Sequence, residues 1–129
     1  LTRTYVHSGG TWVRMADTDR GGQDPALTHY PVAGGPEIQV PAPWGRGGTT
    51  ADADVVAVTS ADGKYVFAVA WPQARSILSN AHIPCVHADP LLRYGAAGRR
   101  VYVRGKLYLL EGTLDDLSQR VERDILRKF

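Results

Sequence analysis

The residues best able to do chemistry lie together in the segment SNAHIPCVHADP, residues 79–90. Imidazole, thiolate and carboxylate groups all bind zinc when three or four of them converge at about 2.0–2.3 Å, and this segment supplies His82, Cys85, His87 and Asp89. In an extended strand, residues of equal parity share a face. We therefore expect Cys85, His87 and Asp89 to point together and His82 to point to the opposite side. Pro84 indicates an edge strand or a bulge.

Two kinds of site and one structural role are open for this segment. Cys85, His87 and Asp89 are candidate metal ligands, although their spacing matches no standard zinc signature. Alternatively, Cys85 is a candidate catalytic nucleophile with His87 as its base, a reaction that also needs a donor for an oxyanion. The structural interpretation, which the pattern favours, is a small buried thiol beside satisfied histidines.

A second group of acidic residues lies in DTDRGGQD, residues 17–24. Asp17, Asp19 and Asp24 surround two glycines, as in the opening of a calcium-binding loop, and are candidate metal ligands. The twelfth position is Thr28 instead of the bidentate glutamate that such loops need, so a loop capped by aspartate is favoured. No cofactor is predicted, because WGRGGTT, residues 44–50, lacks the Gly-Lys-Ser/Thr ending of a phosphate-binding loop.

Aromatic side chains offer a third chemistry, the binding of carbohydrate. Sugar rings present apolar C–H faces that stack on aromatic planes, and aromatic side chains bring a large contact area with little entropy to lose. Trp44 lies in a loop-like stretch rich in proline and glycine, and Tyr102 and Tyr108 flank Arg104 on the expected polar face of one strand. Candidate ligand-binding residues are therefore Trp44, Tyr102, Arg104 and Tyr108.

Length and composition limit the alternatives. The 129 residues are enough for a single domain, and a net charge of +2 is too small to indicate a nucleic-acid partner. The single cysteine excludes an internal disulfide and leaves exported and cytoplasmic locations both compatible. No run approaches the roughly 18 apolar residues of a membrane span, so no membrane partner is predicted. Because the chain begins at Leu1, we expect a fragment or an end domain of a longer protein.

The elements that position these side chains are mainly strands. Glycines in the turns predict two hairpins, one of residues 5–7 and 12–15, the other of residues 54–60 and 64–71. The last of these strands is apolar on both faces, which indicates a central place in a covered sheet. We further expect a long irregular loop over 16–53 with a short strand at 37–40, a crossing loop over 72–80, an edge strand at 83–87, and a half-buried strand at 101–110 whose Val101, Val103, Leu107 and Leu109 face inward.

The last segment changes to helical periodicity. Thr113 is a suitable N-cap, followed by two aspartates that the helix dipole favours. An apolar stripe with spacings of three and four residues predicts docking on a sheet or on a partner, with basic residues at the C-terminal end. The stripe is Leu114, Leu117, Val121 and Ile125, and the basic residues are Arg127 and Lys128. The predicted fold is a mainly antiparallel β-sheet or β-sandwich of about six strands with one C-terminal amphipathic α-helix.

Two stretches, DGKYVFAVAWPQARSILSNAHIPCVHADP and GRRVYVRGKLYLLEGTLDDL, resemble C-terminal β-sandwich segments of larger bacterial proteins, some with carbohydrate-active neighbours. The likeness carries over no catalytic residue and implies an accessory or end domain. We therefore predict a non-catalytic accessory domain that binds glycan, or that packs against a partner domain or a second copy through the long loop or the C-terminal helix. The alternative is a small metal-dependent or cysteine-based hydrolase that uses Cys85, His87 and Asp89.

Overall fold

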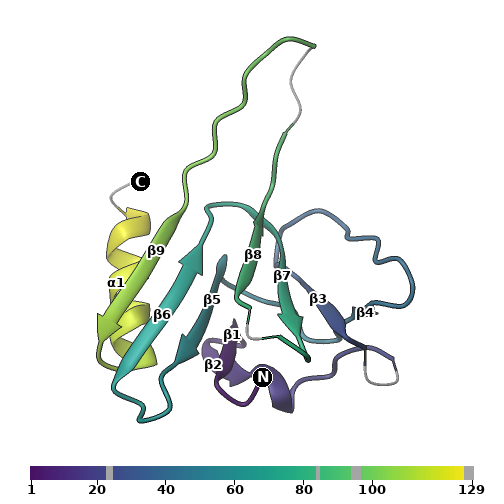
Figure 1. Ribbon diagram of the computed structural model, residues 1–129. Coiled ribbons are helices and arrows are strands. Elements are labelled where there is room, and N and C mark those ends of the chain that lie inside the picture. The colour runs from purple at the N-terminus through teal and green to yellow at the C-terminus, as the bar shows by residue number, and fades with distance from the viewer. Residues whose placement is uncertain (23–24, 84, 94–96, 127–129) are drawn as a thin grey trace.

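The computed structural model shows two packed β-sheets and one C-terminal helix, which confirms the predicted mainly β class (Figure 1). The structure describes residues 1–22, 25–83, 85–93 and 97–126. Sheet A has the strand order β2-β1-β5-β6-β9, and sheet B has the order β4-β3-β7-β8. The strands are β1 (Thr4–Ser8), β2 (Thr11–Arg14), β3 (Leu27–Pro31), β4 (Gly45–Arg46), β5 (Val55–Thr59), β6 (Tyr65–Ala70), β7 (Ala74–Asn80), β8 (His87–Pro90) and β9 (Lys106–Glu111), and a short 3-10 helix, η1, spans Met15–Asp17.

The two predicted hairpins build most of sheet A. Glycine permits the positive φ that tight turns need, and Gly9 and Gly10 at φ 60° and 76° join β1 to β2. Gly63 at φ 72° closes the turn between β5 and β6, where the Asp62 carboxylate accepts hydrogen bonds from the Ser60 hydroxyl at 2.6 Å and the Lys64 amide at 3.1 Å. Strand β6 lies between β5 and β9, so its predicted central position is confirmed.

Helix α1 (Leu114–Leu126) covers one face of sheet A. Thr113 caps it as predicted: its hydroxyl accepts from the Asp116 amide at 3.3 Å, and the Asp116 carboxylate accepts from the Thr113 amide at 2.7 Å. The fully buried Leu117 and the nearly buried Val121 pack on the small side chains Ala57, Val66, Ala68 and Ala70. The side chain of Ile125 and residues Arg127 and Lys128 lie outside the described residues. Helix α1 is too short and too polar to cross a membrane, and no other described helix could do so.

The other face of sheet A packs on sheet B. Val6 and Val56 from sheet A meet Tyr30 and Ile77 from sheet B in a core with no solvent exposure at these four residues. The buried Tyr30 hydroxyl lies 2.8 Å from the Thr18 hydroxyl and 3.5 Å from that of Ser79, so its polar group keeps partners inside the core.

The predicted crossing loop over 72–80 is wrong. Strand β7 occupies Ala74–Asn80 as an inner strand of sheet B, and only Trp71–Gln73 crosses between the sheets. The strand is hard to see in the sequence because two of its buried residues, Ser76 and Ser79 at 1% and 0% exposure, are polar. The predicted edge strand exists but starts later, as β8, and residues 37–40 form no strand.

The predicted strand over 101–110 is also corrected. Only Lys106–Glu111 joins the sheet as β9, while residues 101–104 lie outside both sheets. The two faces of β9 are the reverse of the prediction. Tyr108 is 3% exposed beneath α1, whereas Leu107 and Leu109 are 67% and 75% exposed on the other face.

Candidate functional site

Two connections between the sheets meet at one end of the sandwich. The chain leaves β6 for β7 through Trp71–Gln73, and it returns from β8 to β9 through residues 91–105. Asp54 lies at the same end, since Val55 pairs with Ala70 at the last position of β6. The second connection extends away from the sandwich as an arm, which we define as residues 91–93 and 97–105 (Figure 1).

The base of the arm is fixed on both of its segments. On the first, the Leu91 amide donates a hydrogen bond of 2.9 Å to the carbonyl oxygen of Gln73. On the second, the backbone of Gly105 packs against the indole of Trp71. A Cβ atom added to Gly105 would be only 2.4 Å from ring carbon Cε3. Any larger residue at position 105 must displace the ring, so glycine is required for this close approach.

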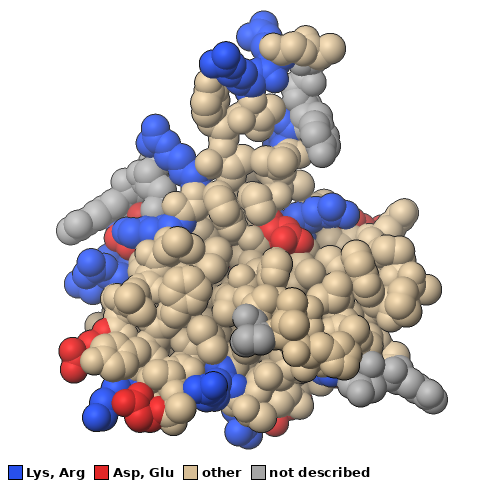
Figure 2. Space-filling model, in the orientation of Figure 1, with Lys and Arg blue, Asp and Glu red and all other residues tan. Residues whose placement is uncertain are grey.

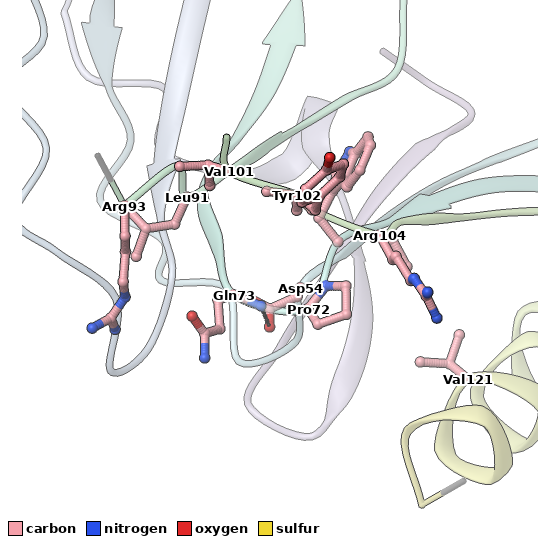
Figure 3. Close-up of a pocket in the computed structure, with 12 residues that line it drawn as sticks. Asp54, Pro72, Gln73, Leu91, Arg93, Val101, Tyr102, Arg104 and Val121 are labelled. Atoms are coloured by element: carbon pink, nitrogen blue, oxygen red, sulfur yellow. Dashed lines mark hydrogen bonds between the residues drawn. The ribbon is translucent and has the colours of Figure 1, made fainter. Parts of the chain in front are cut away.

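A cleft of about 610 Å³ lies between the arm and the sandwich (Figure 3). This volume falls within the range of about 300–1,000 Å³ that is typical of small-molecule sites. Two aromatic rings line the cleft, Trp71 at the base of the arm and Tyr102 on the arm. The side chain of Tyr102 is 79% exposed. The described residues that line the cleft are Asp54, Ala70, Trp71, Pro72, Gln73, Leu91, Arg93, Val101, Tyr102, Val103, Arg104 and Val121.

Some polar groups of the cleft already make hydrogen bonds within the protein, and others do not. The carboxylate oxygens of Asp54 accept hydrogen bonds from the amides of Gln73 at 2.9 Å and Ala74 at 3.1 Å, so Asp54 stabilises the crossing turn, in which Gln73 has a φ of 64°. The guanidinium groups of Arg93 and Arg104 make no hydrogen bond or ion pair within the described part of the chain. Arginine presents several donors in a rigid fork, so these two groups can bind a ligand.

The predicted carbohydrate residues do not form one site. Tyr102 and Arg104 line the cleft, whereas Trp44 stacks on His29 beside sheet B with ring centroids 5.6 Å apart. Tyr108 is buried beneath α1 and does not line the cleft. Burial and the nearby carboxylate of Asp124 raise the pKa of Tyr108, and Asp124 itself is bound by Lys106, whose hydrogen bond lowers its pKa.

The segment of residues 79–90, which is richest in side chains that could bind metal or catalyse a reaction, ends in β8, an edge strand of sheet B. His87 and Asp89 pair with Leu78 and Ser76 and therefore share a face as predicted, while the half-buried Cys85 precedes the strand. The Asp89 carboxylate accepts a hydrogen bond from Ser76 at 3.2 Å. Neither Cys85 nor His87 has a hydrogen-bond partner among the residues that the structure describes, so no base is paired with the thiol.

His82 and Pro84 complete the account of this segment. The His82 side chain is exposed, and the structural role at this position belongs to the backbone: the Asn80 side chain accepts from the amides of His82 at 2.8 Å and Ile83 at 3.1 Å. Pro84, where the sequence indicates a bulge or an edge, lies outside the described residues.

The metal predictions find no support in the arrangement. Within residues 1–22, 25–83, 85–93 and 97–126, no three His, Cys, Asp or Glu side chains are placed to hold an ion. Asp17 instead accepts from Arg14 Nε at 2.8 Å. Asp19 accepts from the Gly21 amide at 2.9 Å, which confirms the loop capped by aspartate. Asp24 lies outside the described residues.

A chain of polar groups that the sequence did not predict crosses the outer face of sheet B. The Ser76 hydroxyl donates to Asp89 and lies 3.4 Å from Nδ1 of His29. In a catalytic triad the histidine lies between the serine and the carboxylate, and here the serine occupies that place. Ser76 is 1% exposed, and burial lowers the pKa of His29. These groups therefore lack the order of a catalytic triad, and Nε2 of His29 is buried with no described hydrogen-bond partner.

A second cavity, of about 300 Å³, lies between α1 and the first hairpin. Its polar donors are paired: His7 bonds to Asp52, and Trp12 Nε1 donates to the Ser118 hydroxyl at 2.8 Å. The remaining polar lining residue, Glu122, is a hydrogen-bond acceptor. The larger cleft is thus the site with unpaired donors. Sequence reasoning missed Arg93, Trp71 and Gln73, although the four arginines and absent acids of residues 91–105 are a visible signal.

Comparison of the chain with protein-family models, with curated proteins and with solved structures gives no match. The resemblance to C-terminal β-sandwich segments of bacterial proteins therefore stays a prediction. The function of the domain has to be inferred from the cleft and the arm themselves.

Proposed function

We propose that this chain is a non-catalytic accessory domain that binds glycan in the cleft between the arm and the sandwich. The observation that carries the proposal is the pairing, in one cleft, of two aromatic side chains with unpaired hydrogen-bond donors. Trp71 and Tyr102 both line the cleft. Figure 3 shows Tyr102 between the guanidinium groups of Arg93 and Arg104. Sugar rings need both kinds of group, apolar planes for their C–H faces and polar groups for their hydroxyls.

Tyr102 is the side chain best placed to stack on a sugar. A tyrosine that is 79% exposed on an extended arm contributes little to the folded core. Large exposed apolar groups in a soluble protein commonly mark an interaction site. The arm is held at its base by Trp71 and Gln73, so the ring of Tyr102 is presented by a segment whose origin is fixed.

The cleft supports binding better than hydrolysis. Glycoside hydrolysis usually needs two carboxyl groups, about 5–10 Å apart, on either side of the scissile bond. Among its described lining residues the cleft has one carboxylate, Asp54, and both oxygens of that group accept backbone hydrogen bonds. A bound sugar therefore meets donors and aromatic planes without an acid–base pair.

The test is titration of wild-type protein and two tyrosine variants against a panel of neutral and acidic oligosaccharides by isothermal calorimetry. Tyr102→Ala should lower affinity at least tenfold, about 1.4 kcal/mol, with no change in melting temperature. Tyr65→Ala is the matched control, because Tyr65 is 45% exposed on β6 but does not line the cleft. No binding of any glycan by the wild type, or equal binding by Tyr102→Ala, would contradict the proposal.

A second candidate function, association with a second copy, is favoured by the outer face of β9. Strand β9 ends the order of sheet A, so no other described strand lies along its outer edge, and it exposes Leu107 and Leu109. Exposed apolar edge strands are templates for pairing with another chain, and two antiparallel copies of β9 can pair symmetrically. The stripe of α1 is covered by sheet A and is not available for this role.

Sedimentation equilibrium distinguishes this second function. The wild type should dimerise at micromolar concentration, and Leu109→Lys should remain monomeric with an unchanged fold. Arg46→Lys, at an exposed position in sheet B, is the control that should still dimerise. A wild type that is monomeric at all concentrations would exclude association through β9.

A further inference from the structure

The arm carries positive charge that is not balanced by acidic residues. Residues 91–105 contain four arginines and no aspartate or glutamate, although the whole protein has a net charge of only +2. All four side chains are exposed, and Figure 2 shows Lys and Arg side chains gathered over the projecting arm. The arginines are Arg93, Arg99, Arg100 and Arg104. None of them makes an ion pair or a hydrogen bond with another described residue.

Two of these arginines bracket the cleft. Arg93 lies on the first segment of the arm and Arg104 on the second, and Figure 3 places them at opposite ends of the cleft with Tyr102 between them. Arg99 and Arg100 lie further out on the second segment. The positive charge thus starts inside the cleft and continues along the arm beyond it.

The acidic group that could oppose this charge is already engaged. Asp54 is the one carboxylate among the described lining residues, and two backbone amides bind it at 2.9 and 3.1 Å. A ligand in the cleft therefore meets two arginines that have no described partner. The one carboxylate there, Asp54, is bonded to the backbone of the turn between β6 and β7. Unlike charges attract across such a surface, and like charges repel.

We infer that the glycan bound by this cleft is an acidic polysaccharide, one that carries carboxylate or sulfate groups. This inference rests on the proposed glycan-binding function and specifies its ligand. The rigid fork of a guanidinium matches the two oxygens of a carboxylate or sulfate and forms short, charge-assisted hydrogen bonds with them. Tyr102 stacks on a ring between two such groups, and Arg99 and Arg100 bind the next acidic residues of the polymer.

Polymer length follows from the arrangement of charge. A single acidic sugar reaches only the groups in the cleft, whereas a longer chain also reaches the outer arginines. Because these contacts are exposed, they are screened by salt and their contribution falls as ionic strength rises. Affinity should therefore increase with the number of sugar residues and decrease with added NaCl.

The experiment is calorimetric titration of the intact 129-residue chain with oligouronate, with a sulfated oligosaccharide, and with a neutral oligosaccharide of equal length. Arg93→Gln/Arg104→Gln should weaken acidic ligands at least tenfold and leave the neutral ligand unchanged. Arg3→Gln/Arg46→Gln is the control: it removes the same net charge from two exposed residues outside the cleft lining and should change affinity less than twofold. The tighter of the two acidic ligands identifies the anion.

The possible outcomes distinguish the inference of an acidic ligand from the proposed glycan binding on which it rests. Equal binding of neutral and acidic glycans, with Tyr102→Ala reducing both, would overturn the acidic ligand and leave glycan binding intact. No binding of any glycan would overturn both. Single-stranded oligodeoxythymidylate that binds as tightly as oligouronate would identify a general polyanion surface and would also overturn the inference.

Discussion

The outer face of sheet B and the cleft under the arm are opposites in how their polar groups are used. On sheet B, the Ser76 hydroxyl joins His29 to Asp89, and the indole of Trp44 stacks on the imidazole. In the cleft, the guanidinium groups of Arg93 and Arg104 have no described partner. The first region contains more of the groups that catalyse reactions, and its central hydroxyl, Ser76, is engaged by both His29 and Asp89, while Nε2 of His29 is buried without a described partner. The second has fewer groups, but they are free to meet a ligand.

This difference separates polar residues that are bonded within the fold from polar residues that are available to a ligand. A buried polar group costs free energy unless it is hydrogen-bonded, so the hydrogen bonds of the Ser76 hydroxyl stabilise the fold and leave this group little capacity for a ligand. An exposed and unpaired donor costs the fold nothing and keeps its binding capacity. The same kind of substitution should therefore have different consequences in the two regions, on stability in the first and on binding in the second.

The largest difference is expected from one substitution made at two tyrosines. Tyr30→Ala removes a fully buried ring and should lower the free energy of unfolding by about 3–5 kcal/mol. Tyr102→Ala removes a ring that is 79% exposed and should change it by no more than about 0.5 kcal/mol. Urea denaturation followed by tryptophan fluorescence measures both. Similar losses of stability would show that the arm is part of the core.

A smaller effect is expected from the Ser76 hydroxyl on sheet B. Ser76→Ala leaves Asp89 and His29 without their shared partner and should cost about 1–2 kcal/mol in urea denaturation, with glycan affinity unchanged. Ser60→Ala is the matched control. Ser60 also donates to an aspartate, Asp62 at 2.6 Å, but in an exposed turn, and its loss should cost less than about 0.5 kcal/mol. A larger loss in the free energy of unfolding for Ser60→Ala than for Ser76→Ala would contradict the larger contribution to stability assigned to the Ser76 hydroxyl.

The smallest effect is a pH dependence of stability from His29. Burial, together with Arg75, lowers the pKa of His29 below its ordinary 6.5, and Asp89 opposes the shift. The unfolded chain then takes up the proton first as pH falls, so this contribution to stability is complete above about pH 6.5 and is lost as pH falls through the lower pKa of the folded state. Thermal melts from pH 7.5 to 5.0 should therefore show a decreasing melting temperature.

His29→Gln should flatten this pH profile, whereas His82→Gln, at an exposed position, should retain it. Glycan affinity measured over the same range should not follow the profile, because arginine stays protonated throughout. An unchanged slope in His29→Gln would assign the pH dependence to another group.

Local sequence patterns predicted the parts of the fold that depend on local rules. Gly63 in the turn and the alternating residues around it predicted the hairpin of β5 and β6, and Thr113 with the stripe of Leu117 and Val121 predicted α1. Strand β7 escaped prediction because its buried serines depend on partners from other strands for their hydrogen bonds, and no local pattern contains that information.

The arm escaped prediction for a topological reason. Val101 and Val103 alternate with polar residues as strand residues do, but β6 has no residue left to pair with them. Ala70, the last residue of β6, pairs with Lys106, and beyond it the chain turns into sheet B. The orientation of Tyr108 was ambiguous because both faces of β9 are apolar, and only the position of α1 decides which one is covered.

The central claim, that ligand binds in the cleft under the arm and not on sheet B, is tested most directly by nuclear magnetic resonance. Amide shifts of the ¹⁵N-labelled chain are followed while an acidic oligosaccharide is added. We predict that the largest shifts fall on Gln73, Arg93 and residues 101–104, with no change at His29. Shifts centred on His29, Trp44 and His87, or an absence of shifts, would contradict the assignment of the cleft as the binding site.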